Sequence, residues 1–156
     1  MELKTRRYCG KPPETVLVDD DFDLSGMTSI YKNHLGYVVV KINGTQDYLH
    51  RIVFGAASGE IIDHINRNKL DNRLANLRKC TTKENCRNSS ISKNNQSGFN
   101  GVSYRNDRKK YRAYIMVDRK QLNLGYYQNI QDAMQARINA ENVYFGEFAP
   151  SVSYYR

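Results

Sequence analysis

The stretch EIIDHINRNKLDNRLANLRKCTTKENCRN, Glu60–Asn88, contains the pattern from which the fold of this chain can be argued. Gly59–Ile65 is rich in β-forming residues, and after a polar run the apolar segment Leu77–Cys80 can return antiparallel to it. Thr81 with Glu84 three residues later forms a capping box, which predicts that a helix starts there. The sequence therefore predicts a β-hairpin followed by a short helix.

Four side chains of this stretch can carry chemistry. Asp63 and His64 are adjacent, Asn76 follows the histidine by 12 residues, and Asn85 follows it by 21. Carboxylate and amide oxygens are hard ligands that suit Mg²⁺ or Mn²⁺, and an imidazole can take a proton from water at neutral pH. Neighbouring residues on a strand face opposite sides, so Asp63 and His64 can share a site only where the strand ends or bulges. The spacing favours a single-metal phosphodiesterase site over the alternative of a structural Asp-His pair and a turn-forming Asn76.

The run DHINRNKLDNRLANLRKCTTKEN, residues 63–85, resembles the HNH nuclease motif of phage and intron-associated homing endonucleases. The resemblance implies a ββα-metal fold with a divalent metal, Mg²⁺ or Mn²⁺, held by Asp63 and Asn85. It implies that His64 is the general base, and that Asn76 fastens the loop and orients His64 through its backbone.

The similarity to this group extends upstream of the motif. VLVDDDFD, Val16–Asp23, and LHRIVFG, Leu49–Gly55, are similar to the segments that precede the motif in the same group. His50 is matched there as well. Because it sits within an apolar run, we interpret it as structural.

Composition favours a polyanionic partner. The chain of 156 residues is long enough for one medium domain or two small ones, and 24 Lys plus Arg against 16 Asp plus Glu leave a net charge of +8. Residues 1–60 have a net charge of −1, residues 61–88 of +4 and residues 89–156 of +5, so any electrostatic footprint for nucleic acid lies after Glu60.

Other classes of protein are disfavoured. No run of apolar residues is long enough to span a membrane, and no apolar segment of a secretory signal follows the basic residues at the amino terminus. Cys9, Cys80 and Cys86 have no paired spacing that would indicate a disulfide framework or a zinc site. We expect a cytoplasmic protein, in the bacterial host if a phage encodes it.

A second domain is expected after a polar boundary. Asn88–Ser97 has almost no apolar content, and beyond it Gly101–Arg105, Tyr111–Val117 and Gln121–Tyr127 have the composition of strands. From Ile130 a helix is predicted with a buried stripe of Ala133, Ala136, Ala140 and Val143, ended by Gly146. The predicted organisation is α+β, with a nuclease domain at 1–88 (core motif 60–88), a linker at 89–97 and a second domain at 98–156.

The carboxy-terminal segment Ser97–Ala149 resembles an AP2-type DNA-binding domain. Its matching features are Gly101-Val102, Tyr111 before Arg112-Ala113, Leu124-Gly125 and the alanine-spaced helix. The resemblance implies a small three-stranded antiparallel sheet plus a helix, with the sheet entering the major groove of DNA. Asn100, Ser103 and Asn123 stand where plant relatives often carry Arg, Arg and Trp, so base contacts are not carried over to them.

We expect double-stranded DNA as the partner and substrate, no membrane, no small-molecule substrate, and a monomer or homodimer. The residues expected to contact DNA share a basic or aromatic side chain in or beside the two motifs: Arg67, Lys69, Arg73, Arg78, Lys93, Arg105, Lys109, Lys110, Tyr111, Arg112, Arg119 and Lys120. The leading prediction is a metal-dependent DNA endonuclease that nicks or cuts both strands. The alternatives are a non-catalytic DNA-binding regulator with a structural HNH half and, more weakly, an RNA-binding protein.

Overall fold

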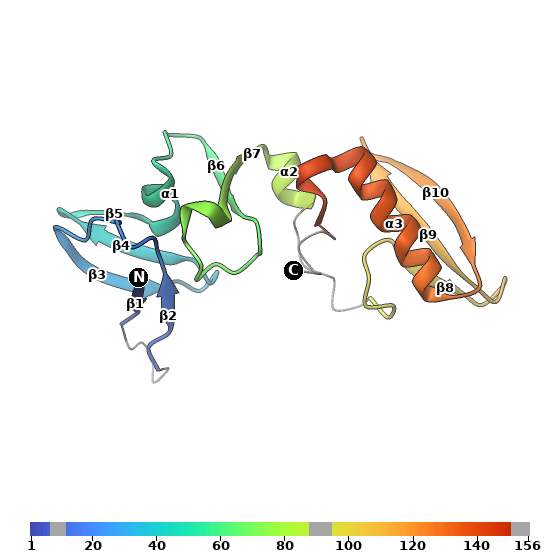
Figure 1. Cartoon of the computed structure of the whole chain (residues 1–156), viewed down its shortest axis with the longest axis horizontal. Coiled ribbons are helices and arrows are strands. Elements are labelled where there is room, and N and C mark those ends of the chain that lie inside the picture. Colours follow the sequence, from blue (N-terminus) through green and yellow to red (C-terminus); the bar gives the residue numbers. More distant parts are fainter. Residues whose placement is uncertain (7–11, 88–94, 151–156) are drawn as a thin grey trace. The chain divides into compact units, whose positions relative to one another are not determined.

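The computed structural model describes residues 1–6, 12–87 and 95–150. The chain divides into two compact units, Met1–Asn85 and Cys86–Arg156, which are called unit 1 and unit 2 below. The architecture is mixed, with small antiparallel sheets and few helices in the described residues (Figure 1). None of the helices in this described part is long and apolar enough to cross a membrane.

Unit 1 begins with two small sheets. One pairs β1 (Glu2–Lys4) with β2 (Thr15–Leu17), and the other orders β3 (Met27–Lys32), β4 (Val38–Ile42) and β5 (Thr45–Tyr48) as neighbours. The turn between β4 and β5 has positive φ angles of 49° at Asn43 and 82° at Gly44, as an Asn-Gly hairpin turn requires. Helix α1 (Leu49–Phe54) follows β5 directly.

The apolar core of unit 1 joins these sheets to α1. Its buried side chains are Val16, Val18, Ile30, Val38, Val40 and Leu49. Helix α1 contacts β4 and β5 on one side and the next hairpin on the other. Helix α1 therefore connects this core with the second hairpin.

That hairpin consists of β6 (Ile61–His64) and β7 (Leu77–Cys80), joined by a long loop that ends in a single 3₁₀ turn at Leu74–Asn76. Helix α2 (Thr82–Arg87) follows, with the backbone N–H of Thr81 donating to Glu84 Oε2 (2.7 Å) and that of Glu84 to Thr81 Oγ1 (3.3 Å). Both the antiparallel return and the capping box were predicted, and both are confirmed.

Unit 2 is a three-stranded antiparallel sheet with one long helix against it. Its strands β8 (Val102–Arg105), β9 (Lys110–Val117) and β10 (Lys120–Tyr127) lie in the order β10-β9-β8, and α3 (Ile130–Phe145) packs mainly on β9 and β10 (Figure 1). A final 3₁₀ turn follows at Gly146–Phe148. The three predicted strands and the helix that stops at Gly146 are confirmed.

The buried face of α3 differs from the predicted stripe. Ala133 and Ala140 are buried as predicted, but Val143 is 79% exposed, and Phe145 is buried instead. The stripe was extended one step too far because Val143 falls off the face that carries Ala133 and Ala140. The prediction also missed two charged residues of α3 that lie in the interior, Arg137 and Glu141.

The predicted linker is shorter than expected at its carboxyl end. Asn95 Nδ2 donates to the carbonyl of Phe99 (2.9 Å), and Ser97 Oγ donates to the carbonyl of Val102 (2.6 Å). Asn95 and Ser97 therefore belong to the structure of unit 2. Residues 88–94, the rest of the predicted boundary, lie outside the described residues.

Candidate active site

Asp63 and His64 lie side by side at the end of β6. Both are buried, with exposed fractions of 8% and 3%. The register pairs Asp63 with Arg78 and His64 with Leu77 without a bulge, so their side chains leave the hairpin on opposite faces. A shared site for the two residues was expected to need either a bulge or the end of the strand. The structure has no bulge, but the strand does end at His64.

The face of Asp63 leads toward α2. Arg78 forms an ion pair with the carboxylate, with its Nη2 3.0 Å from Asp63 Oδ2. Burial, and after it the negative charge of Asp63, raise the pKa of the neighbouring Cys80 thiol, an effect that the backbone N–H of Asn85 slightly opposes. Cys80 is thus influenced electrostatically by groups from two different elements, Asp63 of β6 and Asn85 of α2.

The face of His64 leads to a buried asparagine that the sequence analysis did not single out. His64 Nε2 lies 3.3 Å from Oδ1 of Asn72, whose side chain is fully buried. Asn72 Nδ2 donates to the carbonyl of Lys69 (3.3 Å), which fixes the amide orientation and turns Oδ1 toward the imidazole. Since a carbonyl oxygen only accepts, His64 must carry its proton on Nε2 in the neutral form, and Nδ1 then has the lone pair that can accept a proton.

Asn72 reaches this position because the loop after β6 is attached to β2. The backbone N–H of Leu17 donates to the carbonyl of Leu70, and the N–H of Asn72 donates to the carbonyl of Leu17, both at 2.8 Å. These bonds join residues more than 50 positions apart in the sequence. No local pattern could have identified Asn72 as the partner of His64.

Asn76 closes the same loop. Its Oδ1 accepts a bond from the N–H of Asn66 (3.0 Å), and its Nδ2 donates to the carbonyl of Asp71 (2.7 Å). Its own carbonyl accepts from the N–H of Ile65 (2.8 Å), next to His64. Asn76 therefore holds both ends of the loop together, and its link to His64 runs through the backbone.

A second histidine lies beside His64. The ring centroids of His50 and His64 are 5.0 Å apart, and Tyr37 lies 5.4 Å from the first ring and 6.2 Å from the second. His50 is 6% exposed, and its Nδ1 is the one buried side-chain polar atom of the described residues that has no hydrogen-bond partner. A buried polar atom without a partner costs free energy, so the position of His50 Nδ1 destabilises the fold unless a further group binds to it.

The protonation of both rings is set by their surroundings. Burial, followed by the nearby charges of His64 and Arg51, lowers the pKa of His50 to about 4. Burial also lowers the pKa of His64, although the hydrogen bond with Asn72 opposes this effect. Both imidazoles are therefore neutral at pH 7, the form in which His64 can accept a proton.

A cavity of about 260 Å³ opens between α1, the hairpin and α2. It is lined by Tyr37, Tyr48, His50, Arg51, Glu60, Ile61, Ile62 and Asn85. The cavity thus has the unpartnered His50 on one side and Asn85 on the other. From the sequence His50 was interpreted as structural; the structure adds that its buried Nδ1 has no partner and that the residue lines this cavity.

The donor set near the hairpin fits a hard divalent cation. In residues 1–6, 12–87 and 95–150, no group of three or more His, Cys, Asp or Glu side chains could hold a metal ion. A site here would therefore consist of a carboxylate, Asp63, and an amide oxygen, Asn85, with the remaining positions taken by phosphate and water. Oxygen ligands of this kind, few in number, suit Mg²⁺ or Mn²⁺.

The basic residues predicted to contact DNA in unit 1 differ in availability. Arg73 is exposed at 51% and binds Asp71, whose carboxyl pKa it holds below the usual value. Lys69 Nζ lies 3.8 Å from the centre of the Tyr37 ring, near the two histidines, and Arg67 is half-buried in the loop. Arg78 is only 15% exposed and is paired with Asp63, so the prediction that it contacts phosphate is revised to a partner of the carboxylate.

In unit 2 most of the predicted DNA contacts are exposed. Strand alternation puts Arg105, Lys110 and Arg112 on the sheet face opposite α3, while Lys109, Arg119 and Lys120 lie at the two turns. Tyr111 is an exception, because it pairs with Tyr104 on the helix side and packs against the core around Ala113. Lys93 lies outside the described residues.

The described geometry agrees with what comparison with known proteins finds. The HNH endonuclease family model matches residues 47–87, a span that covers α1, the β6–β7 hairpin and α2. Protein 3.8 of Escherichia phage T7 is 39% identical over 79 residues, which are 47% of this chain and 65% of that protein. The chain thus spans somewhat less than two thirds of this curated relative.

No solved structure matches the chain significantly. The matches give no support to an AP2-like assignment of residues 98–156, which stays a prediction. Residues 47–87 thus match the HNH endonuclease family, and the chain is similar to Protein 3.8 of Escherichia phage T7.

Proposed function

We propose that this protein is a metal-dependent DNA endonuclease that hydrolyses phosphodiester bonds in double-stranded DNA. The observation that carries the proposal is the position of His64 within the matched HNH segment. Its Nε2 faces the fixed carbonyl of Asn72, which leaves Nδ1 as the proton acceptor. A histidine held in one tautomer by an amide is arranged as a general base rather than as a packing residue.

In the proposed reaction His64 takes a proton from a water molecule as the water attacks phosphorus in line with the departing 3′ oxygen. The side-chain carbonyl of Asn72 accepts a hydrogen bond from the Nε2–H of His64, and this bond stabilises the imidazolium that forms. Asn76 holds the loop on which Asn72 and His64 depend. Proton transfer of this kind contributes about 10² to 10⁴-fold to a rate.

Asp63 and Asn85 are the residues proposed to hold Mg²⁺ or Mn²⁺. When bound, such a cation stabilises negative charge on the phosphate and the leaving oxygen. Arg78 forms an ion pair with the buried carboxylate of Asp63 and restrains its position. Lys69, Arg67 and the exposed Arg73 are proposed to contact the phosphates of the DNA backbone.

Unit 2 is proposed to bind the target DNA in the manner of an AP2-type module. It carries 11 Lys plus Arg against 5 Asp plus Glu, a net charge of +6. On the sheet face opposite α3, Arg112 Nε donates to Asn123 Oδ1 (3.1 Å) and its guanidinium lies over the Tyr114 ring at 5.4 Å. Such an arrangement presents pre-oriented cationic groups to a groove of DNA. We also propose, as part of the same function, that the protein resembles homing endonucleases in its activity.

The test is cleavage of a pool of supercoiled plasmids with randomised inserts. The wild type should nick or linearise part of the pool with Mg²⁺ or Mn²⁺ and stop when EDTA is added. His64→Ala should lose at least 10²-fold in rate while its affinity for the same DNA is kept. His34→Ala is the matched control, because His34 is exposed and far from the hairpin in sequence.

Asp63→Ala and Asn85→Ala should lose metal-dependent cutting as well. If the wild type binds the pool tightly but cuts no member of it with either metal, the endonuclease proposal fails in favour of a non-catalytic DNA-binding protein.

A further inference from the structure

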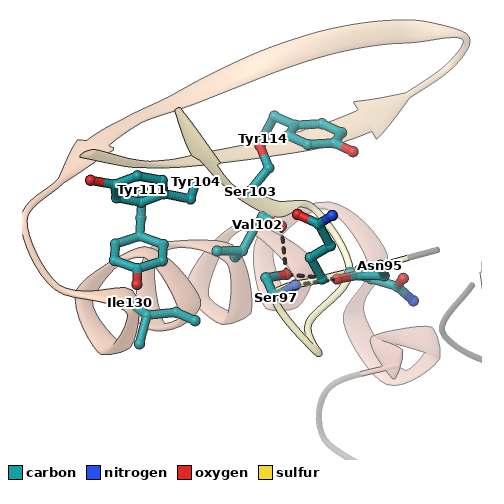
Figure 2. A pocket seen from close by; sticks show the side chains of 10 residues that line it. Asn95, Ser97, Val102, Ser103, Tyr104, Tyr111, Tyr114 and Ile130 are labelled. Atoms are coloured by element: carbon teal, nitrogen blue, oxygen red, sulfur yellow. Dashed lines mark hydrogen bonds between the residues drawn. The ribbon is translucent and has the colours of Figure 1, made fainter. Parts of the chain in front are cut away.

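A cavity of unit 2 lies along the edge strand of its sheet. It has a volume of about 590 Å³, within the range of ligand sites in proteins. In the described sheet β8 has a single neighbour, β9, so the cavity follows an edge that no other strand covers. Figure 2 shows Tyr104, Tyr111 and Ile130 gathered at one end of the cavity, and Asn95 and Ser97 at the other.

One wall of this cavity is rigid. Ser97 Oγ donates to the carbonyl of Val102 (2.6 Å), and Asn95 Nδ2 donates to the carbonyl of Phe99 (2.9 Å), bonds that hold the incoming chain against β8 (Figure 2). Gly101 has a φ of 76°, and a Cβ there would stand 2.4 Å from the carbonyl oxygen of Tyr114. The backbone at Gly101 is therefore packed closely against β9.

The remaining lining has polar groups to offer. Within residues 95–150, the side chains of Gln96, Asn100 and Ser103 form no hydrogen bond. Two amide groups and one hydroxyl group are therefore available to a ligand. Tyr104 is 50% exposed although its ring is large, and it meets Tyr111 edge-on with ring centres 5.0 Å apart. Exposed aromatic rings are costly to leave in water and are typical of stacking surfaces.

The chemistry of this lining defines the class of ligand. No charged side chain lines the cavity, which disfavours a phosphate or a carboxylate as its occupant. Neutral amides and hydroxyls next to aromatic rings match a planar heterocycle with donors and acceptors on its edge, which is the description of a nucleobase. Basic side chains flank the cavity, because Arg105 follows Tyr104 and Arg112 pairs with Ser103 across the two strands.

We propose that the β8 edge cavity takes up an unstacked nucleobase of the bound DNA, between the Tyr104 ring and the amides of Gln96 and Asn100. The phosphates on either side of that base are held by Arg105 and Arg112. This rests on the DNA-binding role proposed for unit 2 and adds to it a contact with a single base that has left the helix. It also gives a use to Asn100 and Ser103, which lack the side chains expected of an AP2-like groove reader.

A second copy of the chain is the other occupant that a strand edge admits, by adding a strand to the sheet. Strand β8 is only four residues long, which leaves little edge for such pairing. The net charge of +6 on unit 2 also opposes the approach of a second copy and favours a polyanion.

The experiment compares two DNA duplexes that differ in one unpaired base, in EDTA so that no cleavage occurs. One duplex is fully paired, and the other carries a single bulged 2-aminopurine whose fluorescence reports stacking. The wild type should bind the bulged duplex about tenfold more tightly, as stacking of one base on an aromatic ring allows, and should change its fluorescence. Tyr104→Ala and Gln96→Ala should reduce that preference to less than twofold and leave binding of the paired duplex unchanged.

Tyr144→Ala is the matched control, because Tyr144 is another exposed tyrosine, on α3 and outside the cavity lining. Equal binding of the two duplexes by the wild type would overturn the base pocket while leaving the DNA-binding role of unit 2 intact, whereas failure to bind either duplex would overturn both. If free 2-aminopurine riboside bound as tightly as the bulged duplex, a DNA strand would not be the source of the base. A dimer of the free protein that Tyr104→Ala dissociates would replace the nucleobase with a second copy.

Discussion

The two units place their polar side chains in opposite ways. Unit 1 buries a set of polar groups around one loop, namely His50, Asp63, His64, Asp71, Asn72 and Asn76, whereas the buried polar groups of the described part of unit 2 are Arg137 and Glu141 alone. In unit 1 one buried nitrogen, His50 Nδ1, has no partner. In unit 2 Arg137 Nε donates to Glu141 Oε1 (2.8 Å), and its Nη1 donates to the carbonyl of Tyr114 (2.7 Å).

This difference separates chemistry from architecture. Buried polar groups cost free energy unless they are bonded, so an arrangement that leaves one unbonded beside a cavity indicates a site for a further group. A fully bonded pair instead indicates a structural link, here between α3 and the middle strand of the sheet. The DNA contacts proposed for unit 2 therefore depend on exposed groups, whereas the cleavage chemistry proposed for unit 1 depends on buried ones.

The largest expected effect tests whether the buried pair of unit 2 is structural. Glu141→Gln leaves the Arg137 charge buried without its counter-ion and should lower the free energy of unfolding of unit 2 by about 3 to 5 kcal/mol. Urea unfolding followed by circular dichroism measures this. The exposed Glu147→Gln should change stability little, and an equally small change in Glu141→Gln would remove the proposed contrast with unit 1.

The next effect concerns the pH dependence of unit 1. His50 has its pKa lowered to about 4, so below about pH 6.5 the unfolded chain binds a proton that the folded chain does not. The free energy of unfolding should therefore decrease as the pH falls from 6.5 toward 4. His50 should account for about 3 kcal/mol of this decrease. His50→Gln should remove this part of the pH dependence in urea unfolding at pH 7, 5.5 and 4.5.

The exposed His34→Gln is the control for that series and should leave the pH dependence unchanged. If His50→Gln and the wild type lost stability in parallel as the pH fell, the buried neutral state of His50 would be contradicted.

A third prediction sharpens the assignment of the site in unit 1. Asn72→Ala removes the carbonyl that holds the His64 tautomer and should lower the single-turnover cleavage rate by about 10²-fold, with DNA affinity retained. Asn72→Asp keeps an acceptor at the same place and should recover part of the rate. Asn68→Ala, in the same loop, is the control. An Asn72→Ala protein that is folded and cuts at the wild-type rate would show that the contact has no catalytic use.

The smallest effect tests the exposed face of unit 2. Arg112→Ala should lower the slope of log affinity against log salt by about one unit, because one phosphate contact is lost, and should weaken binding by about tenfold or less. Filter binding between 50 and 200 mM salt measures the slope. Lys41→Ala in unit 1 is the matched charge control, and an equal change in slope for both variants would show that no defined phosphate contact exists at Arg112.

The features that the sequence predicted are those encoded within a few residues. The Thr81–Glu84 capping box and the stop of α3 at Gly146 each depend on backbone conformations or bonds between near neighbours. Such local preferences can be recognised without knowing the rest of the fold. The strands β1, β2 and β3 were not predicted, because they are short and their pairing is long-range.

The site was predictable in its residue types and only partly in its geometry. The segment around Asp63 and His64 was identified from spacing, and residues 47–87 match the HNH endonuclease family. The contact of Asn72 with His64, the closeness of His50 and the burial of Arg78 were not predicted. Each depends on which side of a strand or loop meets a distant element.

By itself, the sequence determined the residue types of the candidate site and the positive charge of the chain after Glu60. It also determined the order of the hairpin, the helix and the second sheet. These properties depend on residue type and on neighbours along the chain. Only the tertiary structure decided that backbone bonds to Leu17 hold the loop so that Asn72 contacts His64. It also decided that α3 buries the Arg137–Glu141 ion pair and exposes Val143. Those outcomes depend on contacts between distant residues, whose formation is decided by the packing of the whole unit.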